Sequence, residues 1–313
     1  MRTSTRTRHA RRIDAAVAHL QQCVERSEML PDLAALADRA CVSAYHFHRV
    51  WRASTGEALG RTLTRLRLTR AVQLLVAGRS VTEAALSVGY GSSQALARIF
   101  RAELGVTPAV VRGQSDAAAA LLARLAPPAR LQDGTAPEVE IVATDPFRIV
   151  ALRHRGSFDA LDDSYGRLFG WAETQGPADA IEALVGLPVD DHRDVAPQRL
   201  RFVAALRLAA AARPPRPLRM LTVPGGWHAR LRHVGPYEAL EAATDRLLSD
   251  WWAASGIELR AAPLHYHFLD DPEAVAAAAL RADILLPLET GAPVRPAARA
   301  DRMANARVPP AVR

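Results

Sequence analysis

The sequence predicts a two-part chain, with an all-α N-terminal domain followed by an α+β domain that contains an antiparallel sheet. Three observations predict this. A helix-turn-helix pattern occurs twice near the N-terminus, a strand-turn-helix pattern occurs twice in the second half, and the excess of basic residues lies in the first part. Of the 313 residues, 49% are apolar, which is enough for packed cores in both parts. We divide the chain into a basic arm at 1–8, a helical domain at 9–112, a helix end that runs into a linker at 113–137, an α+β domain at 138–289 and a disordered tail at 290–313.

The charge of the chain is divided unevenly. Residues 1–131 carry 19 arginines against nine acidic residues, whereas residues 132–313 carry 21 arginines against 24 acidic residues. The chain contains no lysine, so every basic side chain except histidine ends in a planar guanidinium group. An excess of ten positive charges in the first part is typical of a domain that binds a polyanion.

The first repeat lies in the helical domain. The segment VSAYHFHRVWRASTG at 42–56 aligns with GSSQALARIFRAELG at 91–105 at an offset of 49 residues. Each copy follows a short helix, at 33–40 and 81–88, and a tight turn. Serine is expected at the start of each second helix, where its hydroxyl accepts a backbone N–H: Ser43 in the first copy, Ser92 or Ser93 in the second. Gly56 and Gly105 are expected to end these helices.

Each of the two second helices has one apolar and one polar face when its residues are placed at 100° intervals. The predicted buried faces are made by Phe47, Val50 and Trp51, and by Leu96, Ile99 and Phe100. The predicted exposed faces carry Tyr45, His48, Arg49 and Arg52, and Gln94, Ala97, Arg98 and Arg101. Arginine pairs with guanine and glutamine with adenine in the major groove, so these faces are candidate base-reading surfaces. A merely solvated face would explain one such helix, but two matching copies in a basic domain favour DNA binding.

A single amphipathic helix is expected between the copies, within EALGRTLTRLRLTRAVQLLVAG at 57–78. About 17 residues of helix span roughly 25 Å. A spacer of this size can place two reading helices in successive major grooves, which are about 34 Å apart along B-DNA.

These segments resemble the AraC/XylS-type DNA-binding domain, which has two helix-turn-helix units in one chain. The resemblance covers 9–112 and rests on LADRACVSAYHFHRVWRASTG, RLRLTRAVQLL and SVTEAALSVGYGSSQALARIFRAELGVTPAVVR. Ala84 is a departure, because the family usually has a larger residue there. In the most similar subgroup, the resemblance implies that the positions contacting DNA fall on Tyr45, His48, Arg49, Ser93, Gln94 and Arg98.

The second repeat lies in the α+β domain. LRHRGSFDAL at 152–161 aligns with LRHVGPYEAL at 231–240 at an offset of 79 residues. Each copy begins as an alternating strand, turns at glycine and enters a helix, at 158–175 or 237–254. A duplicated unit of this kind is expected to pack about a pseudo-twofold axis and to form a small-molecule cleft between its halves. Further strands are expected at 138–143, 182–187, 201–208, 218–223, 263–269 and 281–287.

This block resembles the GyrI-like effector-binding domain, a duplicated α+β fold with SHS2-type repeats. The resemblance covers about 150 residues and rests on LRHRGSFDAL, GLPVDD, VPGGWHARLRHVGPYEAL, PLHYHFLDDP and ADILLPL. It implies a groove with aromatic walls, and many family members bind lipophilic cations with a buried glutamate as counter-charge. The glutamate position falls on Tyr266, which disfavours a preference for cations, although Glu289 lies just beyond the last strand.

Aromatic side chains are the candidate ligand contacts. Strand alternation places Tyr266 and Phe268 on one face, which we predict to face the groove, and His265 and His267 on the other. Each of these aromatic residues could instead belong to the core. The remaining candidates are Trp171, Trp227, Tyr237, Trp251 and Trp252.

The sequence favours a binding protein over an enzyme. No phosphate-binding loop, dinucleotide-binding glycine motif or nucleophile elbow is present, and we expect no cofactor. His265 and His267 could be metal ligands, but a third ligand is not evident, so no metal is expected. The two cysteines fit a reducing cytoplasm, and no apolar run is long enough to span a membrane.

Together these features predict a cytoplasmic, nucleoid-associated transcription regulator. Its expected partners are double-stranded DNA, an effector of aromatic size and RNA polymerase. Two alternatives remain open. Some relatives of the GyrI-like fold hydrolyse small strained molecules, so the second domain could be a hydrolase joined to a DNA-binding module. It could also sequester a toxin or another protein.

Overall fold

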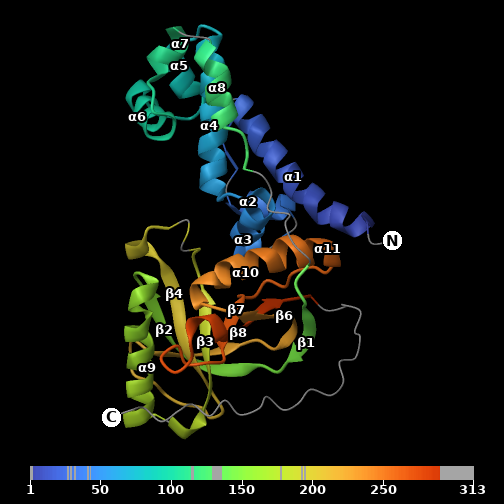
Figure 1. Cartoon of the computed structure of the whole chain (residues 1–313), viewed down its shortest axis with the longest axis vertical. Coiled ribbons are helices and arrows are strands. Elements are labelled where there is room, and N and C mark those ends of the chain that lie inside the picture. Colours follow the sequence, from blue (N-terminus) through green and yellow to red (C-terminus); the bar gives the residue numbers. More distant parts are fainter. Residues whose placement is uncertain are drawn as a thin grey trace. The chain divides into compact units, whose positions relative to one another are not determined.

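The computed structural model of the chain divides into two compact units, Met1–Asp133 and Gly134–Arg313, which we call the helical unit and the sheet unit (Figure 1). Side chains at 3–10, 33–34, 44–45, 113, 116–117 and 159 are not described. The described residues are 3–26, 28, 30–31, 33–40, 42, 44–113, 116–128, 136–176, 178–191, 193 and 195–289. The predicted N-cap Ser43 and the predicted tail at 290–313 therefore lie outside the described residues.

The helical unit contains both predicted helix-turn-helix pairs. Its helices are α1 Thr3–Glu25, α2 Leu33–Ala40, α3 Ala44–Thr55, α4 Leu59–Val76, α5 Val81–Ser87, α6 Ser93–Leu104, α7 Pro108–Gly113 and α8 Asp116–Arg124. The first pair is α2 and α3, the second is α5 and α6, and the two pairs lie at opposite ends of α4 (Figure 1). The predicted single spacer helix is thereby confirmed, with 18 residues.

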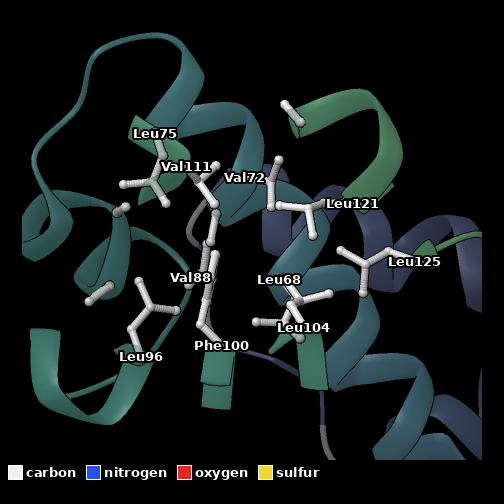
Figure 2. Close-up of a cluster of buried hydrophobic side chains, with 14 residues drawn as sticks. Leu68, Val72, Leu75, Val88, Leu96, Phe100, Leu104, Val111, Leu121 and Leu125 are labelled. Carbon is white, nitrogen blue, oxygen red and sulfur yellow. The ribbon is translucent and has the colours of Figure 1, made fainter. Parts of the chain in front are cut away.

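The prediction at the first border of this unit was wrong, and the prediction at the second was incomplete. The predicted arm at 1–8 is helical from Thr3, because no glycine or proline interrupts the chain between there and Glu25. The predicted linker at 113–137 contains α8, and Leu121 and Leu125 of this segment belong to a hydrophobic core. That core also includes Leu68, Val72, Leu75, Leu96, Phe100 and Leu104 (Figure 2).

Short-range signals fix the start and end of the helices in the second pair. The Ser92 hydroxyl accepts the backbone N–H of Ala95 at 3.2 Å, so Ser92, and not Ser93, is the N-cap of α6. Ser80 and Glu83 form a capping box at the start of α5. Gly105 ends α6 with a φ of 71°, a left-handed conformation that a side chain would strain.

The sheet unit is built on one eight-stranded antiparallel sheet. Its strand order is β1-β6-β8-β7-β3-β4-β2-β5. The strands are β1 Glu140–Thr144, β2 Phe147–Arg155, β3 Ile181–Pro188, β4 Arg201–Leu208, β5 Arg219–Val223, β6 Gly226–Val234, β7 His265–Phe268 and β8 Arg281–Pro287. The helices are α9 Leu161–Gln175 and α10 Leu240–Arg246, and α10 continues through a π-helical segment, Leu247–Trp252, into α11 Ala253–Ser255. All the predicted strands and both predicted helices are present.

The sheet shows how the duplication is assembled. Strands β1 and β2 are offset by 79 residues from β5 and β6, so β1 to β4 form one half and β5 to β8 the other. The halves meet where β3 pairs with β7, with Val185 opposite His267. Each half lends its first strand to the other, because β1 pairs with β6 and β5 pairs with β2. This exchange makes the halves interdependent.

The repeated motif has a structural role in both copies. Gly156 and Gly235 have φ angles of 148° and 136° at the turn after β2 and β6. Two residues before each glycine, the Nε2 atom of His154 lies 3.0 Å from the Ser157 carbonyl, and that of His233 lies 3.0 Å from the Pro236 carbonyl. These imidazole groups therefore close the turns that lead into the helices.

Among the described residues, no helix combines the length and the apolar character that crossing a membrane requires.

Candidate functional sites

Helix α6 carries an exposed polar row. Leu96, Phe100 and Leu104 are fully or almost fully buried on one side, which fixes the rotation of the helix. Gln94, Arg98 and Arg101 are exposed on the other side, and Ser93 is partly exposed. The exposed row lines a hollow of about 470 Å³ together with Ala97 and Ala102. The prediction of an exposed Gln-Arg-Arg face on this helix is confirmed.

Helix α3 matches the prediction only in part. Phe47, Val50 and Trp51 are fully buried as predicted, and the indole N–H of Trp51 donates to the Thr62 hydroxyl at 3.1 Å. His48 is exposed and Arg52 is partly exposed, but the side chain of Tyr45 lies outside the described part of the helix.

The predicted exposure of Arg49 was wrong, because this residue retains only 9% of its accessible surface and interacts with other groups of the chain. Helical position alone did not reveal this. A long aliphatic stem can be covered by its surroundings while the guanidinium group binds protein atoms. Base contact by Arg49 therefore remains a prediction.

The predicted ligand contacts Tyr237, Tyr266 and Phe268 lie together in the sheet unit. The Phe268 ring centroid is 4.9 Å from that of Tyr237 and 6.4 Å from that of Tyr266. Sequence reasoning missed two further members, Tyr165 of α9, 6.2 Å from Phe268, and Phe202 of β4. We call these five residues the aromatic cluster. Both halves of the sheet unit contribute to it, and a ligand cleft at this place stays a prediction.

Gly186 explains how these rings fit over the central strands. A Cβ atom at this position would lie 2.5 Å from Cζ of Phe202 and 2.9 Å from Cε2 of Phe268. The rings therefore rest directly on the β3 backbone. A glycine inside a strand is the sequence signal that could have indicated this close approach.

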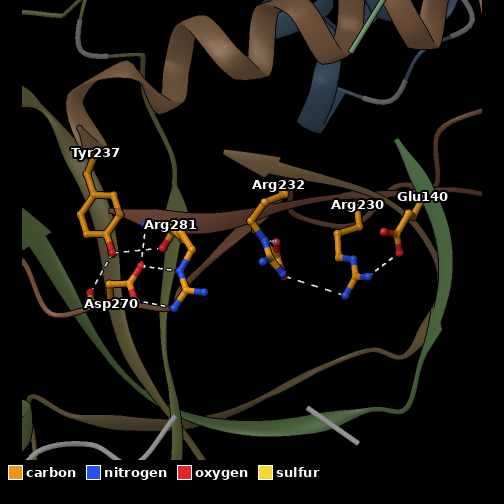
Figure 3. Close-up of polar contacts among 7 residues, drawn as sticks. Glu140, Arg230, Arg232, Tyr237, Asp270 and Arg281 are labelled. Atoms are coloured by element: carbon orange, nitrogen blue, oxygen red, sulfur yellow. Dashed lines mark hydrogen bonds and ion pairs between the residues drawn. The ribbon is translucent and has the colours of Figure 1, made fainter. Parts of the chain in front are cut away.

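The hydroxyl groups of the cluster are hydrogen-bonded. Tyr266 is buried, and its hydroxyl lies 3.2 Å from that of Thr244 on α10. Because Thr244 donates its hydrogen to the Leu240 carbonyl at 2.8 Å, Tyr266 is the donor in this pair. Tyr237 donates to the Asp270 carbonyl at 2.7 Å (Figure 3), and burial raises its pKa to about 12. Burial also raises the pKa of Tyr165, which donates to the Val185 carbonyl.

The four candidate tryptophans differ in how far they are buried. Trp171 is buried and packs with Leu168 and Ala172 of α9 against the sheet, and its contact with a ligand stays a prediction. Its position on the helix face that covers β2 and β4 accounts for this burial. Trp252 is buried and donates its indole N–H to the Ile257 carbonyl at 2.8 Å. Trp227 and Trp251 are partly exposed, and their contact with a ligand stays a prediction.

The opposite face of the sheet holds a second cluster, formed by His228, His265 and His267. The ring centroid of His265 lies 5.3 Å from that of His228 and 5.2 Å from that of His267. Three of the ring nitrogens, Nε2 of His265 and both of His267, are buried without a hydrogen-bond partner. Sequence alternation placed His265 and His267 on one face but could not show that His228, on another strand, joins them.

Burial and nearby positive charge keep these imidazoles neutral. Burial lowers the pKa of His267 to about 4, and Arg207 adds to this effect. Burial also lowers the pKa of His228 to about 4, with a contribution from Arg260. The pKa of His265 is lowered by burial and by both neighbouring histidines. Among the described residues, no group of three or more His, Cys, Asp or Glu is arranged to hold a metal ion.

Ion pairs flank the histidine cluster. The carboxylate of Asp283, opposite His267 in the sheet, is buried and accepts hydrogen bonds from Arg232. Arg230 lies 4.0 Å from the same carboxylate and also pairs with Glu140 (Figure 3). A second pair, Arg281 with Asp270, lies beside Tyr237 in the same view.

Two family models match the chain, one in each unit. A family model described as a GyrI-like small molecule binding domain matches residues 137–289. A helix-turn-helix domain model matches residues 36–114. The two matches do not overlap, and they leave residues 115–136 between them.

Curated relatives match one part of the chain or the other. The probable transcriptional regulator YgiV of Escherichia coli K12 is 26% identical over 157 residues, which cover 48% of this chain and 96% of that protein. The transcriptional regulator Rob of Salmonella typhimurium is 32% identical over 131 residues, 41% of this chain and 44% of Rob. The chain thus spans less than half the length of Rob.

Two solved structures are similar to parts of the chain. The C-terminal domain of EcmrR is 15% identical, with a TM-score of 0.39, and the match covers 49% of this chain and 97% of that domain. The DNA-binding domain of AdpA, solved with a target DNA, is 33% identical, with a TM-score of 0.29, and the match covers 32% of this chain and 89% of that domain.

Proposed function

This chain joins an AraC-type helix-turn-helix DNA-binding domain to a GyrI-like small-molecule-binding domain, and from this premise we propose a transcriptional regulator whose DNA binding responds to a small molecule. The observation that carries the DNA-binding part is the exposed row of Gln94, Arg98 and Arg101 on a helix whose other face is buried. Side chains of this kind form bidentate contacts with guanine and adenine. We further propose that the protein acts on the chromosome in the cytoplasm and contacts RNA polymerase there.

Selection of duplexes from a random pool by the full chain tests this proposal. A regulator of this type enriches one sequence pattern with two adjacent half-sites, one for each helix-turn-helix pair. Enrichment of no pattern would contradict sequence-specific binding. The selected duplex is the probe for the DNA-binding experiments below.

The affinity for this duplex is expected to fall steeply with salt. If roughly five to eight arginines neutralise phosphates, the logarithm of the association constant decreases by about 0.9 per phosphate for each tenfold increase in salt. The slope is therefore expected between roughly −4.5 and −7. Fluorescence anisotropy over a salt series measures it. An association constant that hardly changes with salt would show that the arginines of the helical unit do not bind the phosphates of duplex DNA.

We propose that the ligand binds at the aromatic cluster and is neutral or weakly polar. The cluster offers flat apolar rings and phenol hydroxyls, and the buried Tyr266 stands at the position where the family resemblance implies a glutamate. A cation at this place would keep only its attraction to the rings, about 0.5–2 kcal/mol. That attraction is weaker than the effect of a desolvated carboxylate partner.

Tyr266→Glu is expected to raise the affinity for a lipophilic cation such as tetraphenylphosphonium by at least tenfold, because it supplies the missing counter-charge. Calorimetry on the full chain measures this, with 1-naphthol as the neutral probe and Tyr266→Phe as the control. The control removes only the hydroxyl group and should leave cation binding weak. Tight binding of tetraphenylphosphonium by the wild type, unaffected by Tyr266→Ala, would show that the site or its charge is misplaced.

We also propose a ligand sensor and not an enzyme. The hydroxyls of Tyr165, Tyr237 and Tyr266 donate hydrogen bonds, and the pKa values of Tyr165 and Tyr237 are raised, so these two phenols are poor bases at neutral pH. Incubating the purified chain with the ligands that it binds, and following their turnover by chromatography, tests this proposal. Multiple turnover of a bound ligand would favour a hydrolase.

A further inference from the structure

Helix α8 lies outside both family matches, yet it packs into the helical unit. It spans Asp116–Arg124, between the helix-turn-helix match that ends at residue 114 and the small-molecule-binding match that begins at residue 137. Leu121 lies in α8 and Leu125 directly follows it, and their side chains are 6% and 8% exposed. They share one core with Leu96, Phe100 and Leu104, which form the buried face of α6 (Figure 2).

The last residue of α8 contacts the end of α6 directly. The Arg124 guanidinium donates to the Leu104 carbonyl at 3.0 Å and to the Glu103 carbonyl at 3.3 Å. The last four carbonyls of a helix have no partner within the helix, and they carry the negative end of its dipole. Arg124 therefore satisfies two of these carbonyls and places a positive charge at that end of the helix.

The same end of α6 has a second support. Glu103 lies 3.6 Å from Arg61 of α4. The C-terminal turn of α6 is thus held from α4 by one ion pair and from α8 by two hydrogen bonds, while Arg98 and Arg101 on the same helix remain exposed. A shift of this turn would displace both arginines relative to a bound duplex.

We infer that α8 is a part of the DNA-binding machinery and that Arg124 is a positioning residue for the second recognition helix. The inference rests on the proposed function, because it takes α6 as the base-reading helix. Arg124 acts through α6 and does not itself need to contact DNA. Helix α8 is the last helix before the small-molecule-binding unit in the chain. If α8 detaches from α6, DNA binding weakens although the residues that contact the bases are unchanged.

Three variants of the full chain test the role of Arg124 on the selected duplex. Arg124→Ala is expected to raise Kd at least fivefold, with an unchanged salt slope and faster hydrogen exchange of the backbone amides in the last turn of α6. Arg124→Lys, which keeps the charge and can still donate to a carbonyl, is expected to restore part of the affinity. Arg26→Ala removes the same charge from an exposed pair with Glu28 and is expected to change Kd less than twofold.

The salt slope separates positioning from direct contact. If Arg124 binds a phosphate, the slope becomes shallower by about 0.9 and the inference is overturned. It is also overturned if Arg124→Ala binds like the wild type or leaves hydrogen exchange in α6 unchanged.

Leu121→Ala provides an independent test, because it loosens α8 without changing any charge. Its Kd is expected to rise at least threefold at an unchanged salt slope, while thermal unfolding remains cooperative. Wild-type affinity in a folded Leu121→Ala variant would overturn the role of α8. Failure of the wild type to select any duplex would instead contradict the proposed function, and the hydrogen-exchange comparison would still decide whether Arg124 holds α6.

Discussion

The sheet unit is expected to lose stability as the pH falls from 6.5 to about 4. The three histidines of the second cluster are neutral in the folded state, because burial and the guanidinium groups of Arg207 and Arg260 lower their pKa values. In the unfolded chain they take up protons near pH 6.5. The unfolded state therefore binds more protons than the folded state in this pH range, and acid favours unfolding.

The expected effect is large because the cluster contains three groups. His267 alone, with a folded-state pKa of about 4 against 6.5 when unfolded, accounts for about 3 kcal/mol of stability that is present above pH 6.5 and lost towards pH 4. The carboxylate of Asp283, which faces His267, acts in the opposite direction and raises its pKa, but burial and Arg207 have the greater effect. Denaturant unfolding of the full chain at a series of pH values measures the loss.

The variant His267→Leu tests whether His267 causes this loss of stability in acid. Both ring nitrogens of His267 lack a hydrogen-bond partner, so an apolar side chain leaves no new buried polar group unsatisfied. The variant is expected to flatten the pH dependence between 6.5 and 4. His233→Gln, outside the cluster, is the control and should retain the wild-type slope. Equal slopes in the wild type and His267→Leu would rule out this histidine as the cause.

Arg98→Ala is expected to cost about 1–3 kcal/mol of binding free energy on the selected duplex and much less on random DNA. The reason is that an exposed arginine on the base-reading face of α6 can form two hydrogen bonds with one guanine, which random sequences seldom place correctly. Competition titrations with the selected duplex and a scrambled one measure both losses. Arg26→Ala is again the control for removal of one positive charge.

Equal losses on both duplexes would assign Arg98 to phosphate binding and leave base specificity to other residues. Arg49→Ala gives a contrasting case in α3. Because Arg49 is 9% exposed and engaged with protein groups, its replacement is expected to lower stability as well as affinity. Thermal unfolding of the two variants distinguishes them, since the exposed Arg98 should leave the midpoint unchanged.

Local patterns in the sequence were sufficient to predict most of the helices and strands and their order along the chain. The offsets of 49 and 79 residues predicted both duplications, and helical periodicity predicted the burial of Phe47, Trp51 and Phe100. Alternation along β7 placed Tyr266 and His267 on opposite faces, as found. These features depend on residues close together in the chain, whose spacing determines which side of a helix or strand they occupy.

Only the tertiary structure decided which of these residues meet. In the folded chain the two halves exchange their first strands, and His228 joins His265 and His267. Arg49 and Trp171 are buried. Arg124, from the segment expected to lead into the linker, contacts the end of α6. The sequence alone determined two duplicated units with a DNA-reading pattern in one and an aromatic pattern in the other. Contacts between residues far apart in the chain depend on how complete elements pack, and periodicity within one element carries no information about its neighbours.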